Sequence, residues 1–388
     1  MGLTDRDIIC FSSHFWDERW FRKQEFMSRF AHKNRILFVE PSFSMARPPE
    51  QHLRKVATNR YFISRVDDLG EGGYLFKPPR ALPKWTIPRI SKATFGWYGA
   101  LIDRAVKRLG FVDPIVWIYE PRYFHALRHI AHSNLVLDLV DDVAAYDHSE
   151  AFASYIEECL VGLVSMSDLL VVSAKTLAEL YGPSASRVVH IANGFDADRF
   201  TPAREQEDLL VGVPRPIIGF IGTLFTFLDF DLLELVARTH RDKSLVLVGP
   251  VERTARDLLA RVTRYENVIH IDAQPQDTIP AYVSSFDVCL NPFLSNRAAD
   301  SVNPLKVYEY LAMGRPVVST LMKALQMEDV ASVIKFASDH VKFCDEIAEC
   351  LDPCLAPASD VLRAAALPYS WERLFEKLNA VCAEVLTR

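Results

Sequence analysis

The alternation of short apolar runs with longer stretches of helical periodicity is the feature that most restricts how this chain can fold. In the first half, runs that suit buried strands lie at 8–11, 36–39, 73–76, 115–118, 135–139, 169–172 and 188–191. Amphipathic helical patterns such as 20–32 and 151–165 separate them. This pattern is typical of βα units around a largely parallel sheet.

The alternation of strand and helix patterns starts again after a segment that has the composition of a linker. Residues 195–216 contain Pro202, Pro214 and a charged run, which is typical of a linker. Beyond it, strands are predicted at 217–221, 244–248, 268–271, 288–291 and 317–319, with helices at 232–240, 255–265, 279–286 and 302–313. A last helical pattern, 371–386, follows Pro368 and has no strand to accompany it.

These patterns predict an α/β protein of two Rossmann-like domains. A chain of 388 residues exceeds one ordinary core, which agrees with this division. We expect an N-terminal domain over 1–200, a second over 201–367, and a C-terminal helix over 368–388 that packs across to the first. Open α/β sheets bind ligands at the carboxyl ends of their strands, so we expect a cleft between the two domains.

Composition and charge limit the class of protein and its expected location in the cell. The chain is 49% hydrophobic and 24% charged, which is ordinary for globular proteins and excludes a disordered class. No apolar run is long enough to span a bilayer, and the first residues lack the pattern of a secretory signal. We therefore expect a cytoplasmic protein, peripheral on the inner face of the plasma membrane.

The charges are unevenly distributed, and this suggests a partner. Residues 1–110 hold 20 Lys and Arg against 11 Asp and Glu, whereas the remainder holds 24 against 39. Eight basic residues fall within 77–108: Lys77, Arg80, Lys84, Arg89, Lys92, Arg104, Lys107 and Arg108. Apolar residues interleave with them: Trp85, Ile87, Phe95, Trp97, Tyr98 and Leu101. We predict that 77–108 binds an anionic membrane surface; the alternative is a buried helix with a basic outer face.

The segment 303–318 has the clearest chemical meaning. It predicts a loop, a helix that begins near Pro304, a stop at Gly314 and a short buried strand. The helix start offers free N–H groups and a positive dipole end to a diphosphate, and Lys306 adds a full charge. Glu309 lies nearly one turn further, where its carboxylate can accept hydrogen bonds from both hydroxyls of a ribose. The alternative is an ordinary helix with Lys306 and Glu309 as a solvated pair.

This segment resembles the donor-site helix of GT-B glycosyltransferases of the broad family 4 group, especially the teichuronic acid type. The resemblance implies that Glu309 holds the nucleotide ribose and that the loop before it contacts the diphosphate. Weaker similarities follow in order along the chain: Ser12-Ser13-His14 with Trp16, Asp141-Asp142, Ala192 to Asp196 with Phe200, and Gly219 to Leu224. The first of these, and residues 153–157, are also similar to the xanthan glucuronosyltransferase type.

Two departures from that family affect the donor site. Ser301 stands where family 4 enzymes usually carry Glu, so a standard retaining mechanism does not follow. The usual basic pair after the glycine loop is missing, so Lys306, Arg297 and backbone N–H groups must neutralise the diphosphate. The predicted donor-binding residues are Gly222, Thr223, Arg297, Ser301, Asn303, Pro304, Leu305, Lys306 and Glu309.

For the transfer itself, an inverting enzyme needs a base that removes the acceptor proton. Asp141 ends an apolar strand and is the favoured base; Asp142 and His14 are further catalytic candidates. Ser12, Ser13 and Trp16 are expected on the acceptor side. The alternative for the Asp pair is helix capping or a structural network. Asp196 and Asp198 form a D-x-D pattern, but at a linker and with too few ligands for a closed metal site, so no metal or other cofactor is expected.

These features predict a hexosyltransferase-like glycosyltransferase. Its donor is a UDP- or GDP-sugar, and its acceptor is a glycan or a polyprenyl-linked glycan of cell-surface or exopolysaccharide biosynthesis. A sugar-nucleotide epimerase and a non-catalytic nucleotide-binding scaffold stay open as alternatives. A dehydrogenase and a P-loop ATPase lack their glycine motifs, and no nucleic-acid-binding motif is present.

Overall fold

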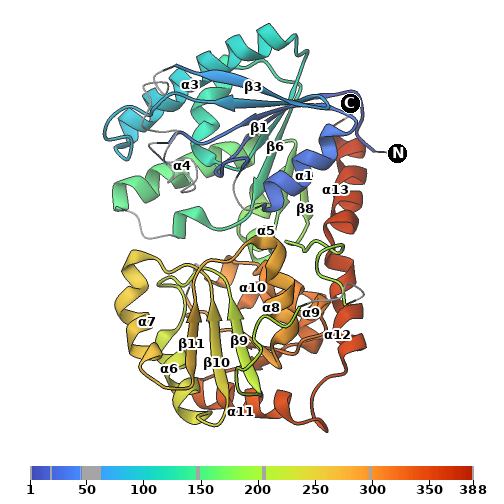
Figure 1. Ribbon diagram of the computed structural model, residues 1–388. Helices are drawn as coiled ribbons and strands as arrows, with labels where there is room; N and C mark the ends of the chain where they lie inside the picture. The colour runs from blue at the N-terminus through green and yellow to red at the C-terminus, as the bar shows by residue number, and fades with distance from the viewer. Residues whose placement is uncertain are drawn as a thin grey trace. The chain divides into compact units, whose positions relative to one another are not determined.

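The computed structural model describes residues 2–17, 20–43, 45, 63–145, 149–202, 207–296 and 299–386. The chain divides into two compact units, Met1–Ile191 with Phe375–Arg388, and Ala192–Leu374. Each unit is built on its own sheet with helices on both faces (Figure 1). The predicted α/β class with two Rossmann-like domains is confirmed.

The first unit contains an eight-stranded sheet in the order β3-β4-β2-β1-β5-β6-β7-β8. Its strands are β1 Asp7–Phe11, β2 Arg35–Val39, β3 Arg65–Gly70, β4 Gly73–Lys77, β5 Ile115–Ile118, β6 Asn134–Leu139, β7 Leu169–Val172 and β8 Val188–His190. All pairs are parallel except β3 with β4. The sequence did not reveal β3, because an edge strand exposed to solvent can carry charged residues without an apolar run.

The helices of the first unit include one from the far end of the chain. They are α1 Arg22–Ala31, α3 Pro88–Leu109, α4 Glu150–Met166 and α5 Lys175–Tyr181, with 3-10 turns η2 Pro121–His129, η3 Val143–Ala145 and η4 Gly182–Ser184. Helix α13, Trp371–Val385, joins them from Phe375 onward and lies beside α1 (Figure 1). The rings of Phe30 and Phe375 meet at 4.8 Å, and Asn379 Oδ1 accepts a hydrogen bond from the Leu3 N–H. The C-terminal helix thus packs on the first unit, as predicted.

The second unit holds a fully parallel six-stranded sheet in the order β11-β10-β9-β12-β13-β14. Its strands are β9 Ile217–Ile221, β10 Ser244–Val248, β11 Val268–Ile271, β12 Val288–Asn291, β13 Val317–Thr320 and β14 Lys335–Ala337. Its helices are α6 Phe230–Thr239, α7 Arg256–Thr263, α8 Ile279–Ser285, α9 Leu305–Ala312, α10 Lys323–Gln326, α11 His340–Leu351 and α12 Ser359–Ala366. Short 3-10 turns are η5 Arg253–Ala255, η6 Gln276–Thr278, η7 Ala299–Ser301, η8 Asp329–Val333 and η9 Leu367–Tyr369.

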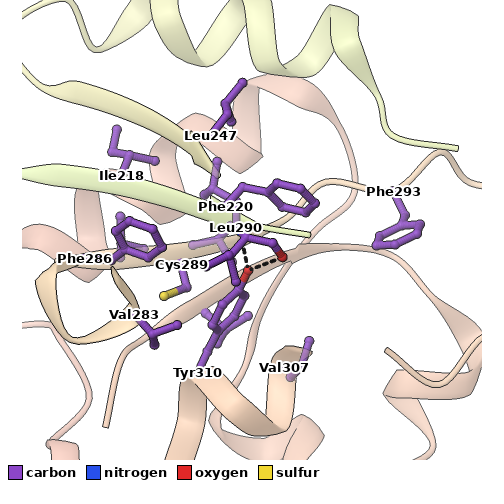
Figure 2. Packing of buried hydrophobic residues seen from close by; sticks show 14 of the residues in the cluster. Ile218, Phe220, Leu247, Val283, Phe286, Cys289, Leu290, Phe293, Val307 and Tyr310 are labelled. Atoms are coloured by element: carbon purple, nitrogen blue, oxygen red, sulfur yellow. Dashed lines mark hydrogen bonds between the residues drawn. The ribbon is translucent and has the colours of Figure 1, made fainter. Parts of the chain in front are cut away.

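A glycine in the core of the second unit lets the end of a helix pack closely against the sheet. Gly219 lies in β9, and a Cβ there would stand 2.1 Å from the Phe286 ring. Phe286 therefore packs directly on the strand backbone, among Ile218, Val283 and Cys289 (Figure 2). These side chains are fully buried, so a larger residue at position 219 would force the end of α8 away from the sheet.

Residues 192–200 belong to the second unit, whereas the predicted first domain extended to 200. The reason is backbone pairing: the Phe195 N–H donates to the Tyr369 carbonyl, and the Trp371 N–H donates to the Phe195 carbonyl. Gly194 permits this approach, since a Cβ there would lie 2.5 Å from the Tyr369 oxygen. These pairings join residues far apart in sequence, so linker composition did not reveal them.

The structure corrects part of the prediction for 77–108. Phe95 and Tyr98 were expected to enter a membrane interface, but both are buried because they lie on the inner face of α3. That face packs against η2, where a Cβ on Gly99 would lie 2.7 Å from the Ala126 carbonyl oxygen. Within the described residues, no helix is long and apolar enough to cross a bilayer.

Candidate donor and acceptor sites

Two glycines end neighbouring strands of the second unit. Gly222 follows β9 with φ +146°, and Gly249 follows β10 with φ +144°, a conformation that side chains rarely adopt. A Cβ on Gly249 would lie 2.0 Å from the Gly222 carbonyl oxygen. The two turns therefore pack backbone against backbone, and no side chain fits at Gly249.

The Lys306 ammonium lies beside the first of these turns. A Cβ on Gly222 would stand only 2.6 Å from Lys306 Nζ. The same Nζ lies 4.4 Å from the ring centroid of Phe220 and 5.3 Å from that of Phe293. Such cation–π contacts stabilise a charged amine at a partly desolvated position. Lys306 belongs to the first turn of α9, so its charge and the positive end of the helix coincide.

Tyr310 holds this helix against the strand. Its hydroxyl accepts a hydrogen bond from the Ile221 N–H at 2.9 Å and donates to the Ile221 carbonyl at 3.3 Å. Figure 2 shows the side chain reaching from α9 into the buried cluster. Burial raises the pKa of Tyr310 well above its ordinary value, so the hydroxyl keeps its proton. Because Tyr310 is one turn after Lys306, this contact also positions the Lys306 side chain.

The other predicted donor residues differ in exposure. Asn303 is 1% exposed; its carbonyl accepts from Asn193 Nδ2 at 2.8 Å, and its Oδ1 accepts from the Asn193 N–H at 3.3 Å. We interpret Asn303 as a residue that shapes the loop before α9. Ser301 and Pro304 are buried, whereas Thr223, Leu305 and Glu309 are half-buried. Arg297 lies outside the described residues.

In the first unit, the predicted acceptor-side residues lie directly after β1. Ser12 Oγ donates to the His14 carbonyl at 2.7 Å and accepts from the His14 N–H at 3.0 Å. This buried hydroxyl therefore holds the turn that carries His14. Ser13 Oγ lies 3.0 Å from His14 Nδ1. The Trp16 ring packs against Phe38 of β2 at 5.0 Å.

Asp141 and Asp142 follow β6, as predicted, but their surroundings differ. Asp142 is 2% exposed, and its Oδ1 accepts a hydrogen bond from the Tyr181 hydroxyl at 3.0 Å. This contact favours the structural alternative for Asp142. Asp141 is half-buried and lies within electrostatic range of Lys23 on α1. The role of Asp141 as the base stays a prediction.

The comparison with known families concerns the second unit. Residues 215–353, which include the two glycine turns, Lys306 and Glu309, match the family described as "Glycosyl transferases group 1". These residues form a group 1 glycosyltransferase domain. TuaH of Bacillus subtilis, assigned to teichuronic acid biosynthesis as a glycosyltransferase, is 26% identical over 168 residues. That alignment covers 42% of this chain and 42% of TuaH, so the chain spans about two fifths of this relative.

Solved structures confirm that the fold is GT-B over nearly the whole chain. Sucrose-phosphate synthase of Thermosynechococcus elongatus superposes with a TM-score of 0.74 at 15% identity, covering 98% of each chain. Anabaena Alr3699/HepE, solved in complex with UDP and glucose, gives 0.70 at 14% identity, covering 97% of this chain and 99% of that one. The predicted GT-B architecture and the resemblance to family 4 enzymes are thus confirmed.

Three charged residues of the first unit, outside the group 1 domain, were missed from the sequence. Lys23 is 5% exposed, and burial lowers its pKa to about 8. Glu40 is 3% exposed, accepts from the Trp16 N–H at 2.9 Å, and burial raises its pKa to about 7. Glu120 follows β5 and is chelated by Arg122 at 2.7 and 2.8 Å. Glu40 and Glu120 each come soon after an apolar run, and a carboxylate at the end of a predicted strand is a signal that could have identified them. Lys23 lies within a predicted helix, and nothing in that helical pattern distinguished it.

The D-x-D pattern of Asp196 and Asp198 lies N-terminal to the group 1 domain, and its first carboxylate stabilises the local backbone. Asp196 Oδ1 accepts hydrogen bonds from the backbone N–H groups of Asp198 and Arg199 at 3.1 and 3.0 Å. Its other oxygen lies 3.3 Å from the Arg199 guanidinium. Among the residues that the structure describes, no three His, Cys, Asp or Glu side chains form a group that could hold a metal ion.

Proposed function

We propose that this protein transfers a sugar from a nucleotide diphosphate sugar to a glycan or lipid-linked acceptor. One observation carries the proposal: the Lys306 ammonium lies beside the Gly222 turn at the start of α9, within a group 1 glycosyltransferase domain. A cation, a helix start and a glycine turn together favour a diphosphate. Glu309, one residue before the Tyr310 anchor, is the proposed ligand of the ribose hydroxyls.

The donor would be a UDP- or GDP-sugar, and its diphosphate would need no metal. The UDP and glucose in the complex of HepE support a UDP-sugar. Lys306 supplies the positive charge that a divalent cation provides elsewhere, and the first N–H groups of α9 add to it. Chelation of divalent ions by EDTA should therefore leave UDP affinity unchanged.

At the acceptor, Asp141 is the proposed base of an inverting transfer. The acceptor hydroxyl attacks the anomeric carbon, its proton passes to the Asp141 carboxylate, and the nucleoside diphosphate leaves with the electron pair of the broken bond. The assignment of TuaH to teichuronic acid biosynthesis supports an acceptor that belongs to a cell-surface polysaccharide. An exopolysaccharide acceptor is compatible with the same chemistry.

Nucleotide binding tests the donor site directly. Glu309→Ala and Lys306→Ala should each weaken UDP or GDP binding by roughly 1.5 to 3 kcal/mol in calorimetry, the range for hydrogen bonds to charged groups. Glu252→Ala, an exposed carboxylate of the same unit, serves as the matched control and should bind normally. Unchanged affinity in both site variants, with an intact fold, would contradict the proposed site.

Product analysis separates the enzyme from the two alternatives. An epimerase converts the nucleotide sugar without any acceptor, whereas a scaffold binds it and leaves it unchanged. A glycosyltransferase consumes the donor and releases the nucleoside diphosphate in proportion to the acceptor supplied. Acceptor-independent formation of a new nucleotide sugar would replace this proposal by the epimerase.

We also propose that the first unit binds an anionic membrane surface through 77–108, at the inner face of the plasma membrane. Exposed cations along this segment are Arg80, Lys84, Arg89, Arg104, Lys107 and Arg108. Leu82, Ile87 and Trp97 are exposed large apolar side chains among them. Arg89, Trp97, Arg104 and Arg108 follow one face of α3 at helical spacing. Each cation near an anionic surface contributes about 1 kcal/mol, so several together would hold the protein there.

Liposome flotation tests this surface. The wild-type protein should float with anionic vesicles and not with neutral ones, and high salt should release it. Arg89→Glu with Arg104→Glu should abolish flotation, whereas Arg253→Glu with Arg256→Glu, an equal charge change in the second unit, should not. Equal recovery with both kinds of vesicle would rule the anchor out.

A further inference from the structure

A buried lysine contacts the imidazole of His14. Lys23 lies in the first turns of α1 and is 5% exposed. Its Nζ is 2.8 Å from His14 Nδ1, and Ser13 Oγ is 3.0 Å from the same ring nitrogen. Since an ammonium carries only donors, the Lys23 cation can approach Nδ1 so closely only if that nitrogen has no proton.

We propose that Lys23 is a positioning residue that holds His14 in the Nε2–H tautomer, so that His14 acts as a hydrogen-bond donor to a substrate oxygen and not as the base. In a neutral imidazole, one nitrogen must carry the proton. With Nδ1 accepting from Lys23, the proton resides on Nε2. The proposed contact between His14 and a substrate oxygen rests on the proposed transferase function, whereas the proposed tautomer of His14 is independent of it.

The charges around Lys23 explain why it can stay protonated in a buried position. Asp141 after β6, Asp138 within β6 and Glu120 after β5 each favour its charged form. The Nζ also lies 5.5 Å from the Tyr119 ring centroid. Burial acts against these groups and lowers the pKa of Lys23 to about 8. At neutral pH the amine is therefore mainly an ammonium and a donor.

The same surroundings keep His14 neutral. Burial and the Lys23 charge together lower the pKa of His14 to about 3. A group with so low a pKa is a poor proton acceptor near neutral pH, whereas its remaining N–H is a good donor. This division leaves proton removal to Asp141, which also interacts electrostatically with Lys23.

Nitrogen-15 NMR of the histidine rings in the ligand-free full-length protein tests the tautomer without any turnover. His14, assigned through His14→Gln, should give the Nε2–H pattern between pH 5 and 7 and should not protonate in this range. In the wild type, a change in the ring signals with a midpoint near pH 8 should accompany deprotonation of Lys23. An Nδ1–H pattern at pH 7, or titration near pH 6.5, would overturn the inference.

Two variants then test the link to activity. Lys23→Met should raise the pKa of His14 and mix its tautomers, and should lower kcat at least tenfold without changing UDP affinity. Lys23→Arg keeps the positive charge and should retain the Nε2–H tautomer. Normal kcat in a folded Lys23→Met protein would overturn the positioning role. Failure of the transferase proposal would instead appear in the wild type as no acceptor-dependent release of nucleoside diphosphate, with the His14 tautomer unchanged.

Discussion

Replacement of Gly222 by alanine tests whether the glycine turn and Lys306 form one site. The backbone at Gly222 has φ +146°, where alanine is strained, at a cost of about 1 to 3 kcal/mol of stability. The new Cβ would also lie 2.6 Å from Lys306 Nζ, closer than real contacts allow. Since Nζ is the far end of a flexible side chain, the ammonium moves away from the turn at little further cost to folding.

The displacement should appear in nucleotide affinity. A charged hydrogen bond contributes about 1.5 to 3 kcal/mol, so its loss should weaken UDP or GDP binding by about 10- to 150-fold. Gly212→Ala is the matched control: its φ is +88°, yet nothing lies within 4 Å of the added Cβ. Gly212→Ala should therefore lose stability through strain alone and should bind nucleotide normally.

Calorimetric titration with UDP and GDP, together with urea denaturation of both variants, separates the two effects. The expected result is a similar loss of stability in both proteins and a loss of affinity only in Gly222→Ala. If Gly222→Ala binds within twofold of the wild type, the Lys306 ammonium does not contact the diphosphate, and the reasoning from this turn is wrong.

Three further predictions follow from single contacts. Tyr310→Phe removes both hydrogen bonds to β9 and should lower the free energy of unfolding by about 1 to 3 kcal/mol in urea denaturation, while weakening nucleotide binding. Asp141→Asn should reduce turnover about 10²-fold or more with donor affinity unchanged, whereas Asp142→Asn should mainly reduce stability; the reverse pattern would exchange their roles. Glu40 keeps its proton in the folded state up to a pKa of about 7 but releases it near 4.5 when unfolded, so stability should fall by about 3 kcal/mol as pH rises from 4.5 to 7. Glu40→Gln should remove that slope, and an unchanged slope would contradict the burial argument.

Much of the fold and of the donor site could be predicted from local patterns. Apolar runs marked the parallel strands, because strands covered on both faces need nearly continuous hydrophobic residues. The Pro304 and Gly314 signals framed the helix of Lys306 and Glu309, and the structure places α9 there. The residues that begin a helix and the charged residue beside them lie within a few positions of one another in the chain. The sequence alone is therefore enough to locate such an anion-binding helix start.

Only the tertiary structure decided which side chains share a site in the first unit. Lys23 and His14 lie on different elements, and their contact depends on how α1 packs beside the end of β1. The inward orientation of Phe95 and the exposure of Trp97 depend on which face of α3 meets η2. These contacts form between segments that are distant in sequence, so no local sequence pattern predicts them. Burial and pKa depend on the surroundings that a residue has in the assembled structure.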